Sequence, residues 1–269
     1  MYKILATDID GTLFTDDKKI TEKTRRAIKK CADMGVYVIL SSGRYYKGVL
    51  PIAESLGLSE SYHVADNGIC YFNTKGEAEF IKVFDKDEYK VLIEHLRKTC
   101  KSFVVTNETG MWYETDDRRC VETMLPNNGE AHYIKMKDIL DVPNPFKICA
   151  YYETDEERDN ILSREYEKIS GCVSFKVLID FYPKGVDKYE TLLEVAKKLN
   201  VKEEEILAVG DSDNDLPMIE NAGLGVSVKN ASENLKNASD IVLTQTNNED
   251  PLCYVIENII ERTLYTGMF

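Results

Sequence analysis

The sequence has no uncharged run long enough to cross a membrane. A spanning helix needs about 20 consecutive apolar residues, and a stretch such as Val36–Gly43 falls far short of that length. Basic residues are also scarce, because 34 Lys and Arg stand against 47 Asp and Glu, which gives a formal net charge of −13. This balance argues against nucleic acid or an anionic membrane as the main partner. We therefore expect neither as a partner.

Paired cysteines and clustered histidines are also missing. The seven cysteines are widely spread without a Cys-x-x-Cys pair, which disfavours a disulfide framework or a structural zinc site and suits reduced cytoplasmic thiols. His63, His95 and His132 match no metal or catalytic-triad spacing, so we expect structural roles for them. With 269 residues, 43% of them hydrophobic, the chain can bury a real core. These features favour a globular cytoplasmic protein.

Both ends of the sequence alternate strand and helix. Apolar strand candidates are Tyr2–Thr7, Val36–Leu40 and Tyr62–Val64, and a helix follows the N-cap candidate Thr21 and ends at Gly35. Apolar strands of this kind indicate a parallel sheet covered on both faces. The pattern returns after Pro183 with the predicted helices Lys188–Leu199, Leu216–Asn221 and Pro251–Arg262 and the strands Ile206–Val209, Leu224–Val228 and Ile241–Leu243.

The middle of the sequence has a different pattern. Predicted strands at Phe103–Thr106, Ile148–Tyr152 and Val173–Phe181 are mixed with predicted helices near Lys86–Thr99 and Glu156–Ile169, and Val142–Pro145 is linker-like. This pattern favours an α+β insert with an antiparallel sheet. We therefore predict a discontinuous α/β core of residues 1–82 and 186–269, interrupted by a smaller domain of residues 83–185.

Two carboxylates follow the first predicted strand, in the run Asp8-Ile9-Asp10-Gly11-Thr12. If the extended backbone continues, Asp8 and Asp10 share a side, at the strand end where open α/β sheets bind ligands. Two close carboxylates favour a bound cation or a shared proton. Gly11 lets the backbone turn sharply beside an anion. The alternative is an ordinary Asp-rich turn.

A second acidic run, Gly210-Asp211-Ser212-Asp213-Asn214-Asp215, follows the predicted strand Ile206–Val209. Its oxygen-bearing side chains suit a hard cation such as Mg²⁺. A calcium-binding EF-hand is excluded, because Pro217 stands where that loop needs Gly and Ala222 where it needs Glu.

Two smaller elements lie between the acidic runs. Ser41-Ser42-Gly43-Arg44 follows the strand Val36–Leu40, so a hydroxyl and backbone N–H groups can meet an anion there. Lys188 begins a predicted helix, from which its ammonium could neutralise phosphate oxygens and a carboxylate. Each element taken alone is also common in structural turns and on solvated surfaces.

The order of these elements along the whole chain resembles the haloacid dehalogenase-like hydrolase superfamily. More narrowly, the insert between Ser42 and Lys188 resembles the C2-type cap of the Cof-type subfamily. The turn Asn67-Gly68, the pair Asn230-Ala231 with its spacing to Lys236, and Ala238-Ser239-Asp240 match the same group. The resemblance implies a Rossmann-like core with an inserted cap that determines substrate specificity.

The resemblance also implies a role for each candidate residue. Asp8 would be the nucleophile, and Asp10 the general acid and then the base. Asp8, the backbone carbonyl of Asp10, and Asp211 would hold Mg²⁺. Asp215 would support the metal without binding it directly. The residues implied to contact phosphate or substrate are Gly11, Ser42, Gly43, Arg44, Lys188 and Asn214.

These roles imply a Mg²⁺-dependent phosphatase that acts on a small phosphorylated metabolite through an aspartyl-phosphate on Asp8. An acid at Asp10 favours rapid hydrolysis of that intermediate. A sugar-phosphate phosphomutase would use the same residues, and a non-enzymatic phospho-aspartate regulator is a more distant alternative.

The substrate stays open among sugar phosphates, nucleotides and cofactor phosphates. In the insert, the side chains that suit substrate contact suit cap-sheet packing or a solvated surface equally well: Trp112, Tyr113, Arg118 and Arg119. The chain departs from the family at Tyr189, where Gly is usual and where the ring could narrow the pocket, and at Asn248–Pro251, which replaces an Asp-Gly turn.

Overall fold

A computed structural model describes residues 1–128, 132–175 and 177–266. The chain divides into two compact units. Unit 1 contains Met1–Glu79 and Asp187–Phe269, and unit 2 contains Phe80–Val186. The boundaries expected from the sequence were 82/83 and 185/186. Among the described residues, no helix is both long enough and apolar enough to span a membrane.

Unit 1 is built on a parallel five-stranded sheet in the order β14-β13-β12-β1-β2. Its strands are β1 (Ile4–Thr7), β2 (Tyr37–Leu40), β12 (Ile206–Gly210), β13 (Leu224–Ser227) and β14 (Ile241–Val242). The sequence predicted each of them to within two residues, because each is a short apolar run. β1 lies between β2, which follows it in sequence, and β12, which comes about 200 residues later. The strand order therefore reverses between β1 and β12, the place where such sheets bind ligands.

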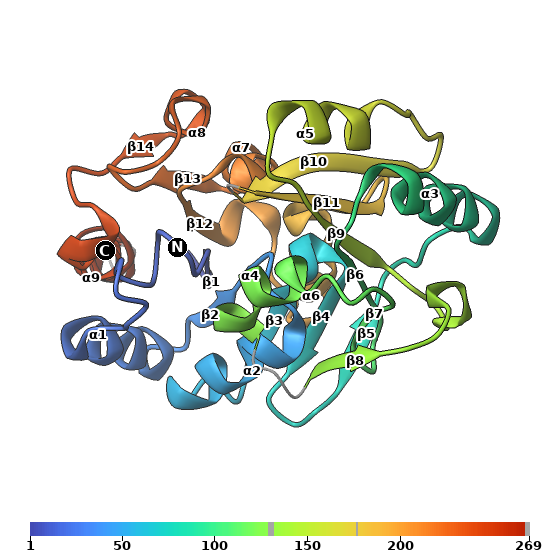
Figure 1. Ribbon diagram of the computed structural model, residues 1–269. Coiled ribbons are helices and arrows are strands. Elements are labelled where there is room, and N and C mark those ends of the chain that lie inside the picture. Colours follow the sequence, from blue (N-terminus) through green and yellow to red (C-terminus); the bar gives the residue numbers. More distant parts are fainter. Residues whose placement is uncertain (129–131, 176, 267–269) are drawn as a thin grey trace. The chain divides into compact units, whose positions relative to one another are not determined.

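Helices cover both faces of this sheet. In Figure 1, α1 and α9 lie on one side and α6 and α7 on the other. The helical segments of unit 1 are α1 (Glu22–Asp33), α2 (Tyr46–Ser55), α6 (Lys188–Lys198), α7 (Leu216–Asn221), α8 (Glu233–Ala238), α9 (Pro251–Val255), the π-helical turn Ile256–Ile260 and α10 (Glu261–Thr266). Short 3₁₀ turns span Asp66–Gly68, Glu203–Glu205, Asp213–Asp215 and Asn247–Glu249. Thr21 caps α1 as predicted, since its hydroxyl accepts from the backbone N–H of Thr24.

The third predicted strand does not join the parallel sheet through a regular ladder. β3 (Tyr62–Ala65) pairs antiparallel with β4 (Cys70–Asn73), and β5 (Ala78–Phe80) completes this small sheet. β3 meets the end of β2 through a single parallel bridge between Ser41 and Val64. The expectation of a regular third parallel strand was therefore wrong. The sequence of Tyr62–Val64 does not indicate antiparallel pairing, because the partner strand comes from the segment that follows it.

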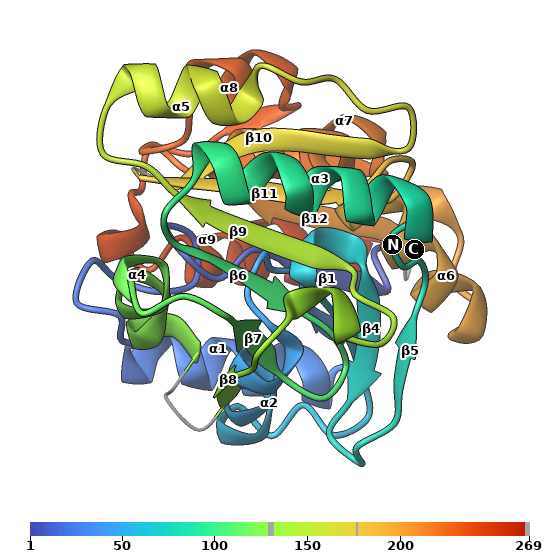
Figure 2. The ribbon, with the colours of Figure 1, turned by 45° about the vertical axis from the view of Figure 1, so that its right-hand side comes forward.

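Unit 2 is an α+β fold on a six-stranded sheet in the order β10-β11-β9-β6-β7-β8. Its elements are α3 (Lys86–Thr99), β6 (Phe103–Thr106), β7 (Met111–Tyr113), α4 (Arg119–Asn128), β8 (Tyr133–Lys135), a 3₁₀ turn (Ile139–Asp141), β9 (Lys147–Tyr151), α5 (Asp155–Leu162), β10 (Ile169–Phe175) and β11 (Leu178–Pro183). In Figure 2, α3 runs along the sheet beside β9 and β11. A buried apolar cluster that includes Leu92, Ile148 and Phe181 holds the helix there.

Three expectations for unit 2 need correction. The sheet is mixed, since β7 pairs parallel with β8 while the other described pairs are antiparallel. The run expected as one strand, Val173–Phe181, belongs to two antiparallel strands, and its Lys176 lies outside the described residues. The helix expected to reach Ile169 ends at Leu162. The apolar pattern alone could not show where this run turns from the first strand of the hairpin to the second.

Candidate active site

The two acidic runs meet at the carboxyl edge of the parallel sheet in unit 1. β1 and β12 pair in register up to Thr7 and Val209, and the N–H of Asp8 donates to the carbonyl of Val209 at 2.9 Å. Asp8 and Asp211 therefore leave two neighbouring strands at the same edge. Asp8 is buried, with 5% of its surface exposed. Residues 8 and 211, which were expected to converge, do so.

Lys188 is the buried cation of this edge. Its Nζ lies 2.7 Å from Asp8 Oδ1 and 2.6 Å from Asp215 Oδ1, and its side chain has no exposed surface. The side chain of Asp187 caps α6 by accepting from the N–H groups of Tyr189 and Glu190, which fixes Lys188 at the first helical position. Burial alone would lower the pKa of Lys188, but the charges of Asp215 and Asp8 raise it.

Both carboxylate oxygens of Asp215 accept hydrogen bonds. Oδ1 accepts from Lys188, and Oδ2 accepts from the N–H groups of Asp211 and Ser212 at 3.0 and 3.2 Å. A Cβ at Gly210 would lie 2.7 Å from the Asp215 side chain, so the loop needs glycine there to fold over this carboxylate. Asp215 thus holds the loop that carries Asp211.

Three carboxylates at this edge could hold a metal ion. One oxygen each from Asp8, Asp211 and Asp215 lie within 4.8 Å of one another. Burial, together with the nearby charges of Asp215 and Asp211, raises the pKa of Asp8 well above its usual value despite Lys188. Burial and Asp215 raise the pKa of Asp211 to about 7. A hard divalent cation would relieve this repulsion, and carboxylate oxygen is the ligand type that Mg²⁺ prefers, so the donor set fits Mg²⁺.

Gly11 and Thr12 bring the first loop against the second. A Cβ on Gly11, which has a φ of +83°, would lie only 2.3 Å from Asp211 Oδ2. The Thr12 hydroxyl donates to Asp211 Oδ1 at 3.0 Å, and the Asn230 amide donates to the Gly11 carbonyl at 2.8 Å. The close approach of the two loops therefore depends on the absence of a side chain at position 11.

Asp10 lies in a different environment, between two cations. Arg44 donates from Nε to Asp10 Oδ2 at 2.6 Å and from an Nη to Oδ1 at 2.7 Å, and Lys18 Nζ lies 2.6 Å from Oδ1. Burial alone would raise the pKa of Asp10, but the hydrogen bonds and charges of Arg44 and Lys18 lower it below its usual value. These contacts favour the ionised form of Asp10.

Ser42, Gly43 and Asn214 gather around the turn Asp66–Gly68. Asp66 and Asn67 both have a positive φ, and the Asn67 side-chain oxygen accepts from Asn214 Nδ2 at 3.0 Å. A Cβ on Gly43 would lie 2.8 Å from that same oxygen. Ser42 is 1% exposed, and its Oγ accepts from the N–H of Arg44.

The same turn packs on the start of α6. A Cβ on Gly68, with a φ of +96°, would meet the backbone carbonyl of Asp187. The Thr191 hydroxyl donates to the Gly68 carbonyl at 2.5 Å. The turn that orients Asn67 therefore also supports the helix end that carries Lys188.

At two positions the structure shows contacts that the sequence did not predict. Arg44, grouped with the phosphate-binding residues, directs its guanidinium at Asp10. Tyr189 does not narrow this edge, because its hydroxyl reaches Glu203 and the Asn221 carbonyl, and Glu203 precedes β12. Sequence reasoning missed Lys18, which lies in a turn and therefore belongs to no helical or strand pattern that would place it beside Asp10.

The other sequence candidates have partners of their own within their unit. In unit 2, Trp112 donates from its ring N–H to Asn107, Arg119 is paired with Asp117, and the Arg118 guanidinium lies 5.8 Å from the centre of the Tyr113 ring. His63 accepts from the N–H of Leu40 inside unit 1. Asn248–Pro251 lies at the start of α9, where Asp250 accepts from the hydroxyls of Thr21 and Thr24.

Comparison with known proteins agrees with this geometry. A haloacid dehalogenase-like hydrolase family model matches residues 5–256. A Bacillus subtilis protein named 5-amino-6-(5-phospho-D-ribitylamino)uracil phosphatase YcsE is 30% identical, over 95% of each chain. Phosphatase YwpJ from the same organism is 26% identical, over 96% of this chain and 100% of its own.

Solved structures give the same result. A haloacid dehalogenase-like hydrolase from Bacteroides thetaiotaomicron superposes with a TM-score of 0.87 at 28% identity, covering 96% of this chain and 100% of its own. A Thermotoga maritima protein superposes with a TM-score of 0.83 at 29% identity, covering 96% and 98%. The chain therefore belongs to the haloacid dehalogenase-like hydrolases of Cof type, and its enzyme class is that of a phosphoric monoester hydrolase.

Proposed function

We propose that this enzyme is a Mg²⁺-dependent phosphatase of small phosphomonoesters, with Asp8 as the covalent nucleophile. The observation that carries the proposal is the position of Asp8, buried against Lys188 and beside Asp211 at two neighbouring strand ends. The same loop carries Asp10, a partly exposed carboxylate that can exchange protons. The two carboxylates lie in unlike environments, as a two-step mechanism requires.

The metal would be held by Asp8, Asp211 and the backbone carbonyl of Asp10. Asp215 would support this set through the loop of Asp211, since both of its oxygens already accept hydrogen bonds from the chain. When bound, Mg²⁺ would supply positive charge that offsets the repulsion between carboxylate and phosphate.

In the first step, an Asp8 oxygen bonds to phosphorus while the bond from phosphorus to the leaving oxygen breaks. Asp10 gives its proton to that leaving oxygen, so it must enter this step protonated. Lys188 carries three N–H donors, two of which go to Asp8 and Asp215, and the third can reach a phosphoryl oxygen. The Ser42 hydroxyl can donate to the same group, because its oxygen already accepts from Arg44.

In the second step, water attacks the phosphorus of the aspartyl-phosphate. Asp10, now a carboxylate, accepts the proton of that water, and the bond from phosphorus to Asp8 breaks. Phosphate leaves and Asp8 is regenerated. One side chain thus serves as acid and then as base.

The substrate class is a small phosphomonoester. The relatives described above are named phosphatases, and the name of one specifies 5-amino-6-(5-phospho-D-ribitylamino)uracil. That compound therefore belongs in a test panel with sugar phosphates, nucleotides and cofactor phosphates. A phosphomutase would isomerise a sugar phosphate much faster than it releases phosphate from it.

We further place the enzyme in the cytoplasm, without nucleic acid or membrane as a partner. The seven cysteines are all unpaired, and six of them are buried. Reduced thiols of this kind are the rule in that compartment. If an oxidant formed one disulfide per molecule and this bond strongly shifted the melting temperature, the result would argue against a cytoplasmic location.

The deciding experiment is a phosphate-release screen over this panel, with Mg²⁺ and after metal removal with EDTA. We expect multiple turnover that requires Mg²⁺, and a rise in melting temperature on adding Mg²⁺ that Asp211→Asn removes. Full turnover in EDTA, or an identical Mg²⁺ shift in the variant, would count against the metal assignment. Isomerisation that greatly outpaces release would favour the mutase.

A further inference from the structure

Lys18 is the least explained member of the cluster around Asp10. Its ammonium lies 2.6 Å from Asp10 Oδ1, while its side chain is 53% exposed. An exposed ion pair of this kind contributes little to folding stability. Folding stability alone therefore explains the ion pair between Lys18 and Asp10 poorly.

The backbone at Lys18 is held in an unfavourable conformation. Its φ is +58°, in the left-handed region that lysine seldom adopts. The turn closes through bonds from the N–H of Lys18 to the Thr15 carbonyl at 2.8 Å and from the N–H of Thr15 to the Lys19 carbonyl at 3.0 Å. Strain of this kind persists where the surroundings fix it and is frequent at functional sites.

Hydrogen bonds from a segment remote in sequence also hold this loop. The Asn247 amide donates to the Phe14 carbonyl and to Asp16, and the N–H of Asp16 donates to Asn248 Oδ1 at 3.0 Å. The Asn248 amide in turn donates to the Asp16 carboxylate. These bonds come from the segment before α9, and they fix the part of the loop that leads to Lys18.

Arg44 holds the same carboxylate from the buried side. Its side chain is 9% exposed, and its guanidinium lies 5.1 Å from the centre of the Phe14 ring. Both Asp10 oxygens accept from Arg44, and Oδ1 also accepts from Lys18. The two cations therefore fix the orientation of the Asp10 carboxylate.

We propose that Lys18 is a positioning residue that, together with Arg44, holds the carboxylate of Asp10 after this residue has given its proton to the leaving group. The inference rests on the function proposed above. As the proton passes from Asp10 to the leaving oxygen, negative charge grows on Asp10, and a cation already in place stabilises that charge. The same contact keeps Asp10 aimed for the second step, in which it accepts a proton from water.

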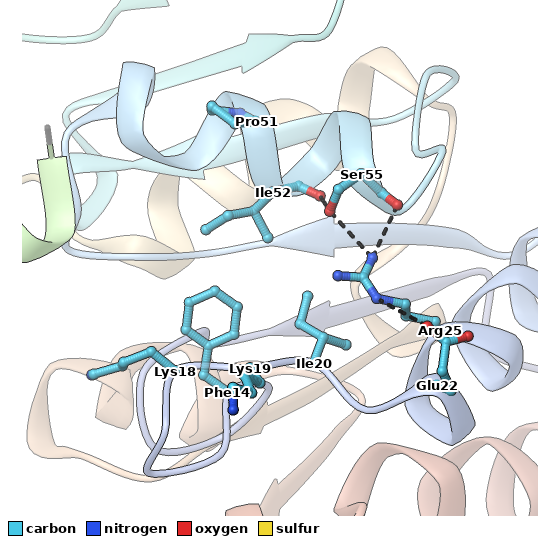
Figure 3. Close-up of a pocket in the computed structure, with 9 residues that line it drawn as sticks. All are labelled: Phe14, Lys18, Lys19, Ile20, Glu22, Arg25, Pro51, Ile52 and Ser55. Atoms are coloured by element: carbon cyan, nitrogen blue, oxygen red, sulfur yellow. Dashed lines mark hydrogen bonds and ion pairs between the residues drawn. The ribbon is translucent and has the colours of Figure 1, made fainter.

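The surroundings of Lys18 allow a clean substitution. The lysine borders a hollow of about 480 Å³ between the loop Phe14–Ile20 and α2. Figure 3 shows Phe14 and Ile52 facing each other across it, with Lys18 at the end away from Arg25. Methionine or arginine at position 18 therefore has room without displacing packed atoms.

The test compares two substrates of similar shape, phenyl phosphate and 4-nitrophenyl phosphate, in the Mg²⁺-loaded enzyme. Phenolate is a poor leaving group that needs a proton, whereas nitrophenolate leaves largely without one. We expect Lys18→Met to lower kcat/KM for phenyl phosphate roughly tenfold or more, and for 4-nitrophenyl phosphate by less than about threefold. Lys18→Arg should restore most of the loss.

The matched control is Lys19→Met, which removes the neighbouring exposed lysine and should leave both values unchanged. An equal loss on both substrates, or no loss on phenyl phosphate, would overturn the role of Lys18. So would a failure of Lys18→Arg to recover activity in a variant whose melting temperature is unchanged. If the wild-type enzyme releases no phosphate from these two substrates or from any member of the metabolite panel, the proposed function itself fails, and the inference fails with it.

Discussion

Two carboxylates of one short loop, Asp8 and Asp10, lie in opposite electrostatic surroundings. Asp8 is buried among other carboxylates with a single lysine, and its pKa is raised. Asp10 is one-third exposed between two cations, and its pKa is lowered. Residues two apart in sequence thus differ because their partners come from different strands and loops. The difference supports the proposed roles of Asp8 as nucleophile and Asp10 as proton carrier.

The comparison also bears on the protonation state of Asp10. A general acid must carry a proton when the leaving group departs, yet Arg44 and Lys18 favour the ionised form of Asp10. In the proposed mechanism, this arrangement corresponds to Asp10 after it has given its proton and before it accepts one from water.

The largest expected effect is that of Asp8→Asn. The variant keeps the volume of the side chain but removes the attacking oxygen, so turnover should fall below about 0.1% of the wild-type value. Phosphate release measures the loss, and circular dichroism should show an intact fold. Substantial turnover by this variant would mean that Asp8 and Asp10 do not divide the roles as proposed.

Lys188→Met should give the largest loss of stability. It leaves Asp8 and Asp215 buried without their cation, so the free energy of unfolding should fall by roughly 3–5 kcal/mol. Urea denaturation measures the change. Lys197→Met on the same helix is the control, since its ion pair with Glu194 is largely exposed. Equal effects of the two substitutions would contradict the importance of burial.

His63 tests the effect of burial without an ion pair. It is buried, and desolvation lowers its pKa to about 4. The unfolded chain takes up this proton near pH 6.5. The folded protein does so only near pH 4, so stability is complete above pH 6.5 and falls as the pH drops toward 4. The loss should reach about 3 kcal/mol. Urea midpoints from pH 7 to 4.5 should fall less steeply in His63→Gln, and parallel curves would contradict the assignment.

The smallest expected effect is that of Lys18→Met on stability. The ion pair with Asp10 is half exposed, and Arg44 still pairs with the carboxylate, so the free energy of unfolding should change by less than about 1 kcal/mol. The same urea assay measures it. A loss as large as that of Lys188→Met would place Lys18 with the buried cluster rather than with the exposed one.

Much of unit 1 could be predicted from the sequence because its strands are short apolar runs and some of its helices begin at side-chain caps. Thr21 and Asp187 mark two helix starts, and Asp8 and Asp211 follow strands that any parallel arrangement brings to one edge. The convergence of these acids therefore follows from local patterns together with one rule of sheet topology.

The rest depends on partners that are remote in sequence. β7, α4 and β8 were not predicted, because β7 and β8 are three residues long and α4 contains Pro126. Lys18 reaches Asp10 only through a left-handed backbone fastened by Asn247 and Asn248, about 230 residues away. No period or motif in the sequence encodes such a contact.

Gly11 has a consequence for how this protein can vary. Its hydrogen faces the Asp211 carboxylate at a distance that no carbon could occupy, and its backbone has a positive φ. A saturation library at this codon should therefore return glycine almost alone among active clones, whereas neighbouring surface codons accept many residues. Position 11 would thus be among the least variable in the family for a reason of shape, although it contributes no functional group.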